Sequence, residues 1–246
     1  MTDTRTALLR DLHKPGDPLI LPNVWDAGSA TVVAEAGFPA LATASASIAA
    51  LLGRGDHQQA PVEEMLDMAA RIIRAVDVPV TVDAEGGYGL PAGELVERLT
   101  AIGAAGFNIE DTDYPGGGLV DAGTQAERIA ALREAGPDLV INARIDVFLT
   151  GSTSAEEVAE RGRRYLEAGA DCVFPILAPS EEVVGDLVEA VAGPVNVTCM
   201  PGMDLDRLAS LGVARVSFGP LTYLTALDAL KAMAGRIRAG GDPYAA

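Results

Sequence analysis

The sequence predicts an α/β fold in which eight short parallel strands and their helices close into one (β/α)8-barrel domain, residues 1–246. Eight apolar runs rich in β-branched residues alternate with segments of helical periodicity. The composition, 49% apolar but only 4% aromatic, is typical of buried parallel strands alternating with helices. No G-x-G-x-x-G motif follows the first run, which disfavours the alternative, an open dinucleotide-binding sheet.

The predicted strands follow one another along the whole chain. They are residues 19–25, 39–45, 78–84, 106–111, 139–146, 172–177, 194–199 and 215–220. The clearest helices between them are residues 62–76, 93–106 and 154–170, the last with the capping-box spacing of Ser154 and Glu157. We expect helices to stop at Gly37, Gly106, Gly169 and Gly212. We expect the first dozen residues and residues 239–246 to lie outside regular structure.

Charge and cysteine content restrict the partners and the compartment. A formal net charge of −17 repels phosphate backbones, so we expect no nucleic-acid partner. The two cysteines, Cys172 and Cys199, have no metal-type spacing, which indicates a reducing compartment and no disulfide framework. The first residues lack the apolar core of a signal peptide, and no apolar run reaches the roughly 20 residues of a membrane span. We therefore expect a cytoplasmic protein with no membrane segment.

Acidic side chains gather where two neighbouring strands end. Asp83 and Glu85 close the strand at 78–84, and Glu110 closes the next one. Active sites of barrels lie at the carboxyl ends of the strands, and residues two apart on a strand project to the same side. Three converging carboxylates require either a proton or a cation. We therefore expect a hard divalent ion with oxygen ligands, Mg²⁺ or Mn²⁺.

Other polar residues at strand ends divide into two groups. Arg144 has the planar fork that binds a substrate carboxylate, and Asn196 and Thr198 lie on the strand at 194–199. An acidic residue at a strand end is alternatively a helix cap or a surface charge. We adopt that interpretation for Asp111 and Asp146.

Several other reaction types lack the residues they need. The only lysines, Lys14 and Lys231, lie near the two ends of the chain, so Schiff-base chemistry is not expected. No histidine ends a strand, so a Ser-His-Asp triad is absent. We place His13 on the surface, and His57 either reaches the site from a loop or is solvated. Both cysteines are expected to be buried structural thiols, with a catalytic role as the alternative for Cys199.

Six motifs occur in order between residues 23 and 146, and the match that they begin extends through VSFGP at 216–220, over nearly the whole chain. They are NVWDAGSA at 23–30, AGFPALATAS, LLGRGD, VDAEGGYG, NIED and ARID. In these motifs the chain resembles the isocitrate lyase and phosphoenolpyruvate mutase superfamily. The resemblance implies a homo-oligomer, a dimer or a tetramer, in which the last helix, residues 221–238, is exchanged between neighbouring barrels.

The resemblance also implies roles for individual residues. It assigns three carboxylates to a Mg²⁺ site held partly through water, namely Asp83, Glu85 and Glu110. Asp56 corresponds to a carboxylate near the metal, and Arg144 to the arginine that orients the substrate. The remaining implied substrate contacts are Trp25, the loop Thr43, Ala44, Ser45 and Ala46, and the pair Asn196 and Thr198.

The chemistry implied by the resemblance is stabilisation of an enolate-like pyruvate fragment on Mg²⁺, with a bond to its C3 made or broken. The substrate is then a small 2-oxo or 2-hydroxy carboxylate, or a phosphonate. The enzyme is a C–C lyase, an oxaloacetate-type hydrolase or a P–C mutase. The alternative is a non-catalytic barrel that binds a small carboxylate, which the complete set of acidic residues disfavours.

The predicted lid, residues 112–119, departs from the superfamily. The lyases carry a K-K/R-C-G-H signature there, whereas this segment has no Cys, Lys or His. Ile176 stands where the lyases have a glutamate. Asp113 and Tyr114 are the only lid side chains able to transfer a proton, and three consecutive glycines predict a mobile lid.

Overall fold

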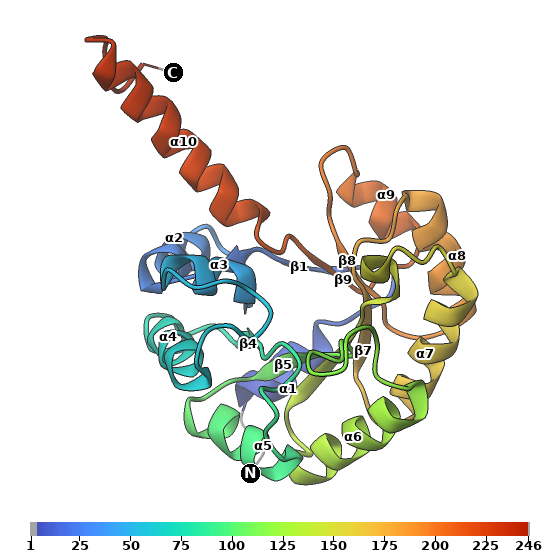
Figure 1. Ribbon diagram of the computed structural model, residues 1–246. Helices are drawn as coiled ribbons and strands as arrows, with labels where there is room; N and C mark the ends of the chain where they lie inside the picture. The colour runs from blue at the N-terminus through green and yellow to red at the C-terminus, as the bar shows by residue number, and fades with distance from the viewer. Residues whose placement is uncertain (1–3, 246) are drawn as a thin grey trace.

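The computed structural model describes residues 4–245, and its short strands form a barrel (Figure 1). The strands are β1 (Leu19–Leu21), β2 (Asn23–Val24), β3 (Leu41–Thr43), β4 (Val80–Asp83), β5 (Gly106–Glu110), β6 (Val140–Ile145), β7 (Cys172–Pro175), β8 (Asn196–Thr198) and β9 (Arg215–Ser217). Strands β1 and β2 occupy one position in the barrel and are separated only by Pro22. Proline has no N–H to donate to a neighbouring strand, so it interrupts the pairing there.

All the strand pairs are parallel, and together they close the barrel. Strands β2 to β7 pair in chain order, and β8 pairs with β9, which pairs with β1. A bridge between Val173 and Val195 connects β7 to the segment that enters β8. The continuous chain from β1 into β2 joins the other two edges. The predicted (β/α)8 barrel is confirmed.

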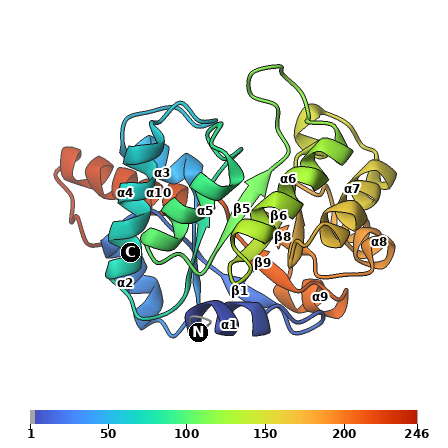
Figure 2. The ribbon, with the colours of Figure 1, turned by 90° about the horizontal axis from the view of Figure 1, so that it is seen from below.

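Most of the helices surround the strands on the outside of the barrel, whereas the first and the last helix lie elsewhere (Figures 1 and 2). The helices are α1 (Thr4–Asp11), α2 (Ala27–Glu35), α3 (Ser45–Leu51), α4 (Val62–Arg74), α5 (Ala92–Ala101), α6 (Ala122–Ala135), the 3₁₀ turn η1 (Val147–Thr150), α7 (Ala155–Glu167), α8 (Glu181–Val191), α9 (Leu205–Ser210) and α10 (Leu221–Arg238). Helices α4, α5 and α7 correspond to the three segments predicted from periodicity. The short helix α3, directly after β3, was not predicted.

Alternation along the strands separates an apolar outer layer from a polar interior. In β5, Phe107 and Ile109 are fully buried in the apolar layer that also includes the buried faces of the helices. Asn108 lies between them and projects to the other side, because successive strand residues face opposite ways. It accepts a hydrogen bond from Asn142 of β6 (2.8 Å) and a longer one from Arg215 of β9 (3.3 Å). The strands therefore carry polar side chains inside the barrel, towards the site.

Helix α1 lies across the amino-terminal end of the barrel (Figure 2). Leu9 is fully buried there beside Leu19 and Val140. His13, just after α1, is only 9% exposed, and its Nδ1 lies 2.7 Å from the Leu9 carbonyl oxygen. The expectations that the first dozen residues lack regular structure and that His13 lies on the surface were therefore wrong. Both depended on local sequence, which does not show that α1 packs under the strands.

Two local expectations need correction. Gly106 does not end a helix but begins β5, where an added Cβ would lie 2.5 Å from the Val140 carbonyl oxygen. The left-handed glycine after α5 is Gly103, with φ +84°. The Ser154 side chain accepts the Glu157 N–H, as predicted, but Glu157 pairs with Arg161 rather than returning to Ser154. Only half of the capping box is present.

Helix α10 projects away from the barrel, and none of its residues is buried (Figure 1). Its first turn contacts the barrel through Tyr223, whose ring lies 5.2 Å from that of Trp25. Further along it exposes large apolar side chains, including Leu224, Leu227 and Leu230. Within residues 4–245, no helix is both long and apolar enough to cross a membrane. Both cysteines are free thiols, and Cys172 is buried.

Candidate active site

A cavity of about 220 Å³ opens at the carboxyl ends of the strands. Six of the predicted site residues line it: Ala44, Ser45, Ala46, Asp56, Asp83 and Arg144. His57 lines it as well, so this loop histidine does reach the site. A larger hollow of about 660 Å³ lies between the loops after β7 and β8 and is lined by none of the predicted site residues. The chemistry of the lining, rather than size, therefore identifies the site.

The other predicted residues lie around this cavity without lining it. They are Trp25, Thr43, Glu85, Glu110, Asn196 and Thr198. Trp25 packs against Tyr223 of α10, and the Asn196 side-chain oxygen accepts a hydrogen bond from Ser217 (3.3 Å). Sequence reasoning missed three polar lining residues, namely Asn23, Asn108 and Ser217. Each is a small polar residue within a strand. Only its orientation towards the inside of the barrel distinguishes it from other polar residues of the sequence.

Strand β3 and the start of α3 hold Asp83 in place. The Thr43 hydroxyl accepts the Asp83 N–H (2.8 Å), and the Ser45 N–H donates to Asp83 Oδ2 (3.0 Å). The resemblance implies that this loop contacts the substrate. In the structure, the Ser45 N–H orients a carboxylate of the protein that lines the cavity.

Glu85 does not share the strand with Asp83, because β4 ends at Asp83. Its φ of +47° turns the chain, so the expectation that both side chains project to one side of a strand was wrong. Glu85 Oε1 accepts the Gln58 N–H (2.7 Å), while the buried Oε2 has no hydrogen-bond partner. Burial raises the pKa of Glu85 to about 7, the Gln58 N–H opposes this shift, and Asp83 adds to it.

Glu110 and Arg144 are register partners on β5 and β6. Arg144 Nη1 lies 2.5 Å from Glu110 Oε2, and Nε and Nη2 of the same guanidinium donate to Asp146 at 2.6 and 3.2 Å. Asp146 is fully buried and does not cap η1 through its side chain. Interpreting it as a cap or surface charge was therefore wrong. Asp146 holds the guanidinium in a two-pronged contact.

The charges around Arg144 do not balance. Burial raises the pKa of Glu110, Arg144 opposes this shift, and Asp146 and Asp83 add to it. Burial acts to lower the pKa of Arg144, but Glu110 and Asp146 raise it by more. The net pKa shift is therefore upward, and the guanidinium stays charged. At the cavity, Arg144 thus faces several carboxylates, while the buried Arg215 lies near enough to Asp83 for their charges to interact.

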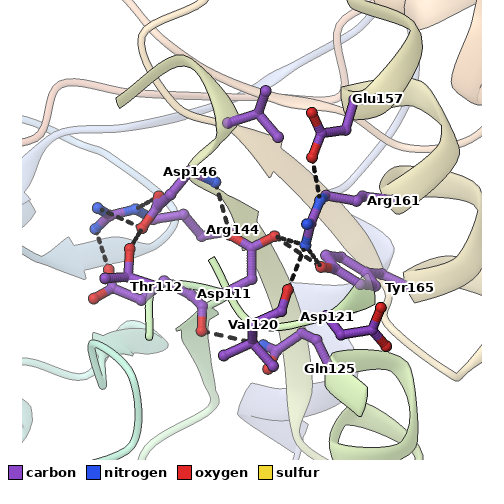
Figure 3. Close-up of polar contacts among 12 residues, drawn as sticks. Asp111, Thr112, Val120, Asp121, Gln125, Arg144, Asp146, Glu157, Arg161 and Tyr165 are labelled. Atoms are coloured by element: carbon purple, nitrogen blue, oxygen red, sulfur yellow. Dashed lines mark hydrogen bonds and ion pairs between the residues drawn. The ribbon is translucent and has the colours of Figure 1, made fainter. Parts of the chain in front are cut away.

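A buried network beneath the lid fixes Asp146 in turn (Figure 3). Asp111, fully buried, accepts the Asp146 N–H (2.8 Å) through Oδ1. Its Oδ2 accepts the Tyr165 hydroxyl (2.7 Å) and Nη1 of Arg161 (3.1 Å), and Nη1 also donates to the Val120 carbonyl (2.9 Å). The interpretation of Asp111 as a cap or surface charge was wrong. Its partners lie more than 30 residues away, beyond what local pattern indicates.

The lid is a hairpin-like loop closed by a bridge between Thr112 and Leu119. The Thr112 hydroxyl donates to Asp146, and the half-buried Tyr114 hydroxyl donates to Glu110. His57 Nδ1 lies 3.5 Å from the same tyrosine oxygen. Tyr114 therefore connects the lid to the acidic residues and to the loop that carries His57.

Within residues 4–245, no three His, Cys, Asp or Glu side chains are placed to hold a metal ion together. Mg²⁺ in proteins is usually bound through one or two carboxylates and several waters, so a cage of three is not required. Asp83 offers carboxylate oxygens at the cavity, and Glu85 retains an unpartnered buried oxygen. The donor set therefore fits a cation held by Asp83 and water, with Glu85 and Glu110 behind it. It does not fit direct coordination by all three.

The closed barrel and the polar cavity at the carboxyl ends of its strands define a (β/α)8-barrel protein laid out like a barrel enzyme. Residues 9–238 match the family model of phosphoenolpyruvate phosphomutase. A solved structure from Burkholderia cenocepacia, described provisionally as a phosphonomutase, is 43% identical with a TM-score of 0.89, covering 95% of this chain and 100% of the other.

Curated relatives agree with this match. A 2-methylisocitrate lyase from Aeropyrum pernix is 30% identical, covering 90% of this chain and 76% of the relative. An oxaloacetate decarboxylase from Pseudomonas putida is also 30% identical, covering 89% and 80%. The chain belongs to the phosphoenolpyruvate mutase and isocitrate lyase superfamily of enzymes, which act on small carboxylates.

Proposed function

We propose that this protein is a divalent-metal-dependent enzyme that stabilises an enolate-like pyruvate fragment and makes or breaks a C–C or P–C bond at its C3. One observation carries the proposal: Asp83, Glu85, Glu110 and Asp146 surround the site, and Arg144 is the only Arg or Lys that lines the described cavity. Buried carboxylates with one compensating cation are unstable unless they take up protons or a metal.

The cation is proposed to be Mg²⁺, with Mn²⁺ as the alternative, because the carboxylates that would hold it offer only oxygen donors. When bound, it would stabilise negative charge on the substrate oxygen. Asp83 would hold it, with Glu85 and Glu110 acting through water.

Arg144 is proposed to bind the substrate carboxylate. Its side chain is 11% exposed and lines the cavity, and Asp146 fixes the plane of the guanidinium. Preorganised charge of this kind stabilises an oxyanion without reorganisation during the reaction. Asp56 and His57 border the same cavity from the loop after α3 and complete its polar side.

Tyr114 and Asp113 are the proposed proton carriers of the lid. Of the two, Tyr114 reaches the acidic residues, since its hydroxyl donates to Glu110. Opening of the loop at residues 112–119 would remove this contact and expose the site to substrate.

The reaction remains one of three: a C–C lyase, an oxaloacetate-type hydrolase or decarboxylase, or a P–C mutase. The 2-methylisocitrate lyase and oxaloacetate decarboxylase relatives support a small 2-oxo or 2-hydroxy carboxylate as substrate. The match to the phosphoenolpyruvate phosphomutase family model supports a phosphonate as a further candidate substrate.

The test combines metal, an enolate mimic and variants. Mg²⁺ with oxalate should raise the melting temperature of the wild-type protein, because ligands that bind only the folded state stabilise it. Arg144→Ala and Asp83→Asn should abolish this shift and also turnover of a panel containing oxaloacetate, 2-methylisocitrate and phosphonopyruvate. Glu64→Gln, on the exposed face of α4, is the matched control and should retain both. If Mg²⁺ with oxalate leaves the melting temperature of the wild-type protein unchanged and no compound of the panel is turned over, a non-catalytic barrel is favoured.

We also propose that α10 packs against a neighbouring copy of the chain, as the resemblance implies. A helix with no buried residue and with Leu227 and Leu230 at 41% and 60% exposure leaves apolar surface uncovered. Leu227→Asp combined with Leu230→Asp should reduce the molar mass measured by light scattering to that of one chain. An unchanged mass would contradict this assembly.

A further inference from the structure

Asn108 differs from the other two small polar residues that line the cavity from the strands, Asn23 and Ser217. Asn23 Nδ2 donates to the Thr43 carbonyl (2.8 Å), and its Oδ1 accepts the Phe218 N–H (2.8 Å). The Ser217 hydroxyl donates to a neighbouring side chain (3.3 Å). For Asn108 Nδ2, by contrast, no acceptor within residues 4–245 lies at hydrogen-bond distance. Asn108 therefore keeps an unused donor group.

The side-chain oxygen of Asn108 is fully used by the protein. Asn142 Nδ2 donates to it from 2.8 Å and Arg215 Nη2 from 3.3 Å, and neither donor residue has exposed surface. A carbonyl oxygen has two lone pairs, and these two contacts occupy both. The amide nitrogen is consequently the group of Asn108 that remains for a ligand.

Arg215 fixes the amide in this orientation. A guanidinium has donors only, so turning the amide over would place its NH₂ group against the N–H groups of Arg215. Nε and Nη1 of Arg215 have no hydrogen-bond partner in the described part of the chain, where Asn108 is the one acceptor of the guanidinium. Burial lowers the pKa of Arg215 to about 10, which leaves it charged at neutral pH and makes the contact charge-assisted.

Strand register places the amide among the groups proposed to bind metal and substrate. Asn108 on β5 is the register partner of Asp83 on β4 and of Asn142 on β6, and Arg144 lies two residues beyond Asn142. Residues two apart on a strand project to the same side. The free donor thus lies between the carboxylate proposed to hold the cation and the guanidinium proposed to bind the substrate.

Resting on the proposed function, we propose that Asn108 is a further substrate-binding residue, whose amide N–H groups donate to a carboxylate or enolate oxygen of the substrate. Arg215 is a positioning residue that acts through Asn108. A donor that is already oriented stabilises negative charge on an oxygen without rearrangement during the reaction. The ligand atom at this point is an acceptor, and an amide or ammonium nitrogen is rejected there.

Calorimetry with oxalate in the presence of Mg²⁺ tests the donor. Asn108→Asp keeps an oxygen for Arg215 but replaces the free donor by an acceptor, and Asn108→Leu removes the donor without adding charge. Both variants should bind oxalate at least about tenfold more weakly than the wild-type protein, because hydrogen bonds to charged groups are strong. Gln59→Glu makes the same amide-to-carboxylate change on an exposed loop and should change the affinity less than about twofold.

Two results with Asn108→Leu would overturn the proposal. If this variant binds oxalate as tightly as the wild-type protein, charge repulsion alone explains the loss in Asn108→Asp. If it loses as much affinity for Mg²⁺ alone as for oxalate, the donor serves water on the metal rather than the substrate. The expected result is wild-type affinity for Mg²⁺ alone and a loss confined to oxalate.

A double-mutant cycle tests the role of Arg215. Arg215→Met should weaken oxalate binding, and Arg215→Lys, which keeps a charged donor, should bind oxalate more tightly than Arg215→Met. In the Asn108→Leu background, Arg215→Met should have no further effect, because Arg215 acts through the amide. An equal loss in both backgrounds would show that Arg215 acts by its charge alone and would overturn its positioning role.

The wild-type protein separates this inference from the proposed function. If it binds oxalate with Mg²⁺ and Asn108→Leu does so equally well, this inference fails and the proposed function stands. If the wild-type protein does not bind oxalate, the proposed function fails and this inference fails with it.

Discussion

Replacing Tyr165 by phenylalanine should destabilise the protein measurably, because the Tyr165 hydroxyl is central to the buried network under the lid. Tyr165 is fully buried, donates to Asp111 (2.7 Å) and accepts from Arg161 (3.1 Å). Hydrogen bonds to charged groups contribute about 1.5–3 kcal/mol, so we take about 2 kcal/mol for the loss. For a chain of this length 1 kcal/mol corresponds to about 3 °C, so the melting temperature should fall by about 6 °C.

Glu157→Gln is the matched control, since Glu157 contacts the same Arg161 from the surface. Its side chain is 42% exposed, and its contact with Nε is an i,i+4 pair at 3.2 Å. Such surface pairs contribute about 0.3–0.5 kcal/mol, so its melting temperature should fall by only about 1 °C. Calorimetric scans at one protein concentration compare the two. A Tyr165→Phe protein no less stable than Glu157→Gln would refute the energetic importance of the network.

Three further predictions concern other parts of the molecule. Asp146→Asn should weaken oxalate binding in the presence of Mg²⁺ by about tenfold, because Arg144 loses its charged two-pronged partner; calorimetry with unchanged affinity would contradict this. Gly106→Ala should lower the free energy of unfolding by about 1–3 kcal/mol, because its Cβ would lie 2.5 Å from a backbone oxygen of the adjacent strand. The control Gly93→Ala, in α5 with open space around it, should raise the free energy of unfolding by about 0.5–1 kcal/mol. Urea titrations measure both changes. Burial lowers the pKa of His13 from 6.5 to about 4, so the unfolded chain binds the extra proton between these values. Relative to His13→Gln, the wild-type protein should therefore lose about 2 kcal/mol of stability between pH 7 and pH 5, because the raised pKa values of Glu85 and Glu110 affect both proteins alike.

The sequence predicted the helices and strands well where one side of the element is apolar. The run at 62–76 corresponds closely to α4, and the strand at 139–146 to β6. The strand prediction extended too far where a polar loop or a short helix follows at once, as at 39–45, where β3 ends at Thr43 and α3 begins at Ser45. Boundaries depend on hydrogen bonds that local composition does not specify.

The site was predicted in part for a related reason. Arg144 and Asp83 lie on strands, where alternation sets the side to which each side chain projects, and both side chains line the cavity. Glu85 was expected to follow Asp83 on the strand, but a left-handed backbone turns its side chain towards Gln58. Alternation predicts direction only while the strand continues.

Three features could be predicted from the sequence by itself: the repeat of strands and helices, the polar residues at the carboxyl ends of the strands, and membership of the superfamily. Each depends on patterns or motifs formed by residues that are close together along the chain. Only the tertiary structure decided that Asp146 clamps Arg144, that Asp111 lies under the lid with Arg161, and that Arg215 donates to the Asn108 amide. These relations depend on strand register and on helices packed against the barrel, which bring together side chains tens of residues apart. Their hydrogen bonds and buried charges exist only once the barrel has closed.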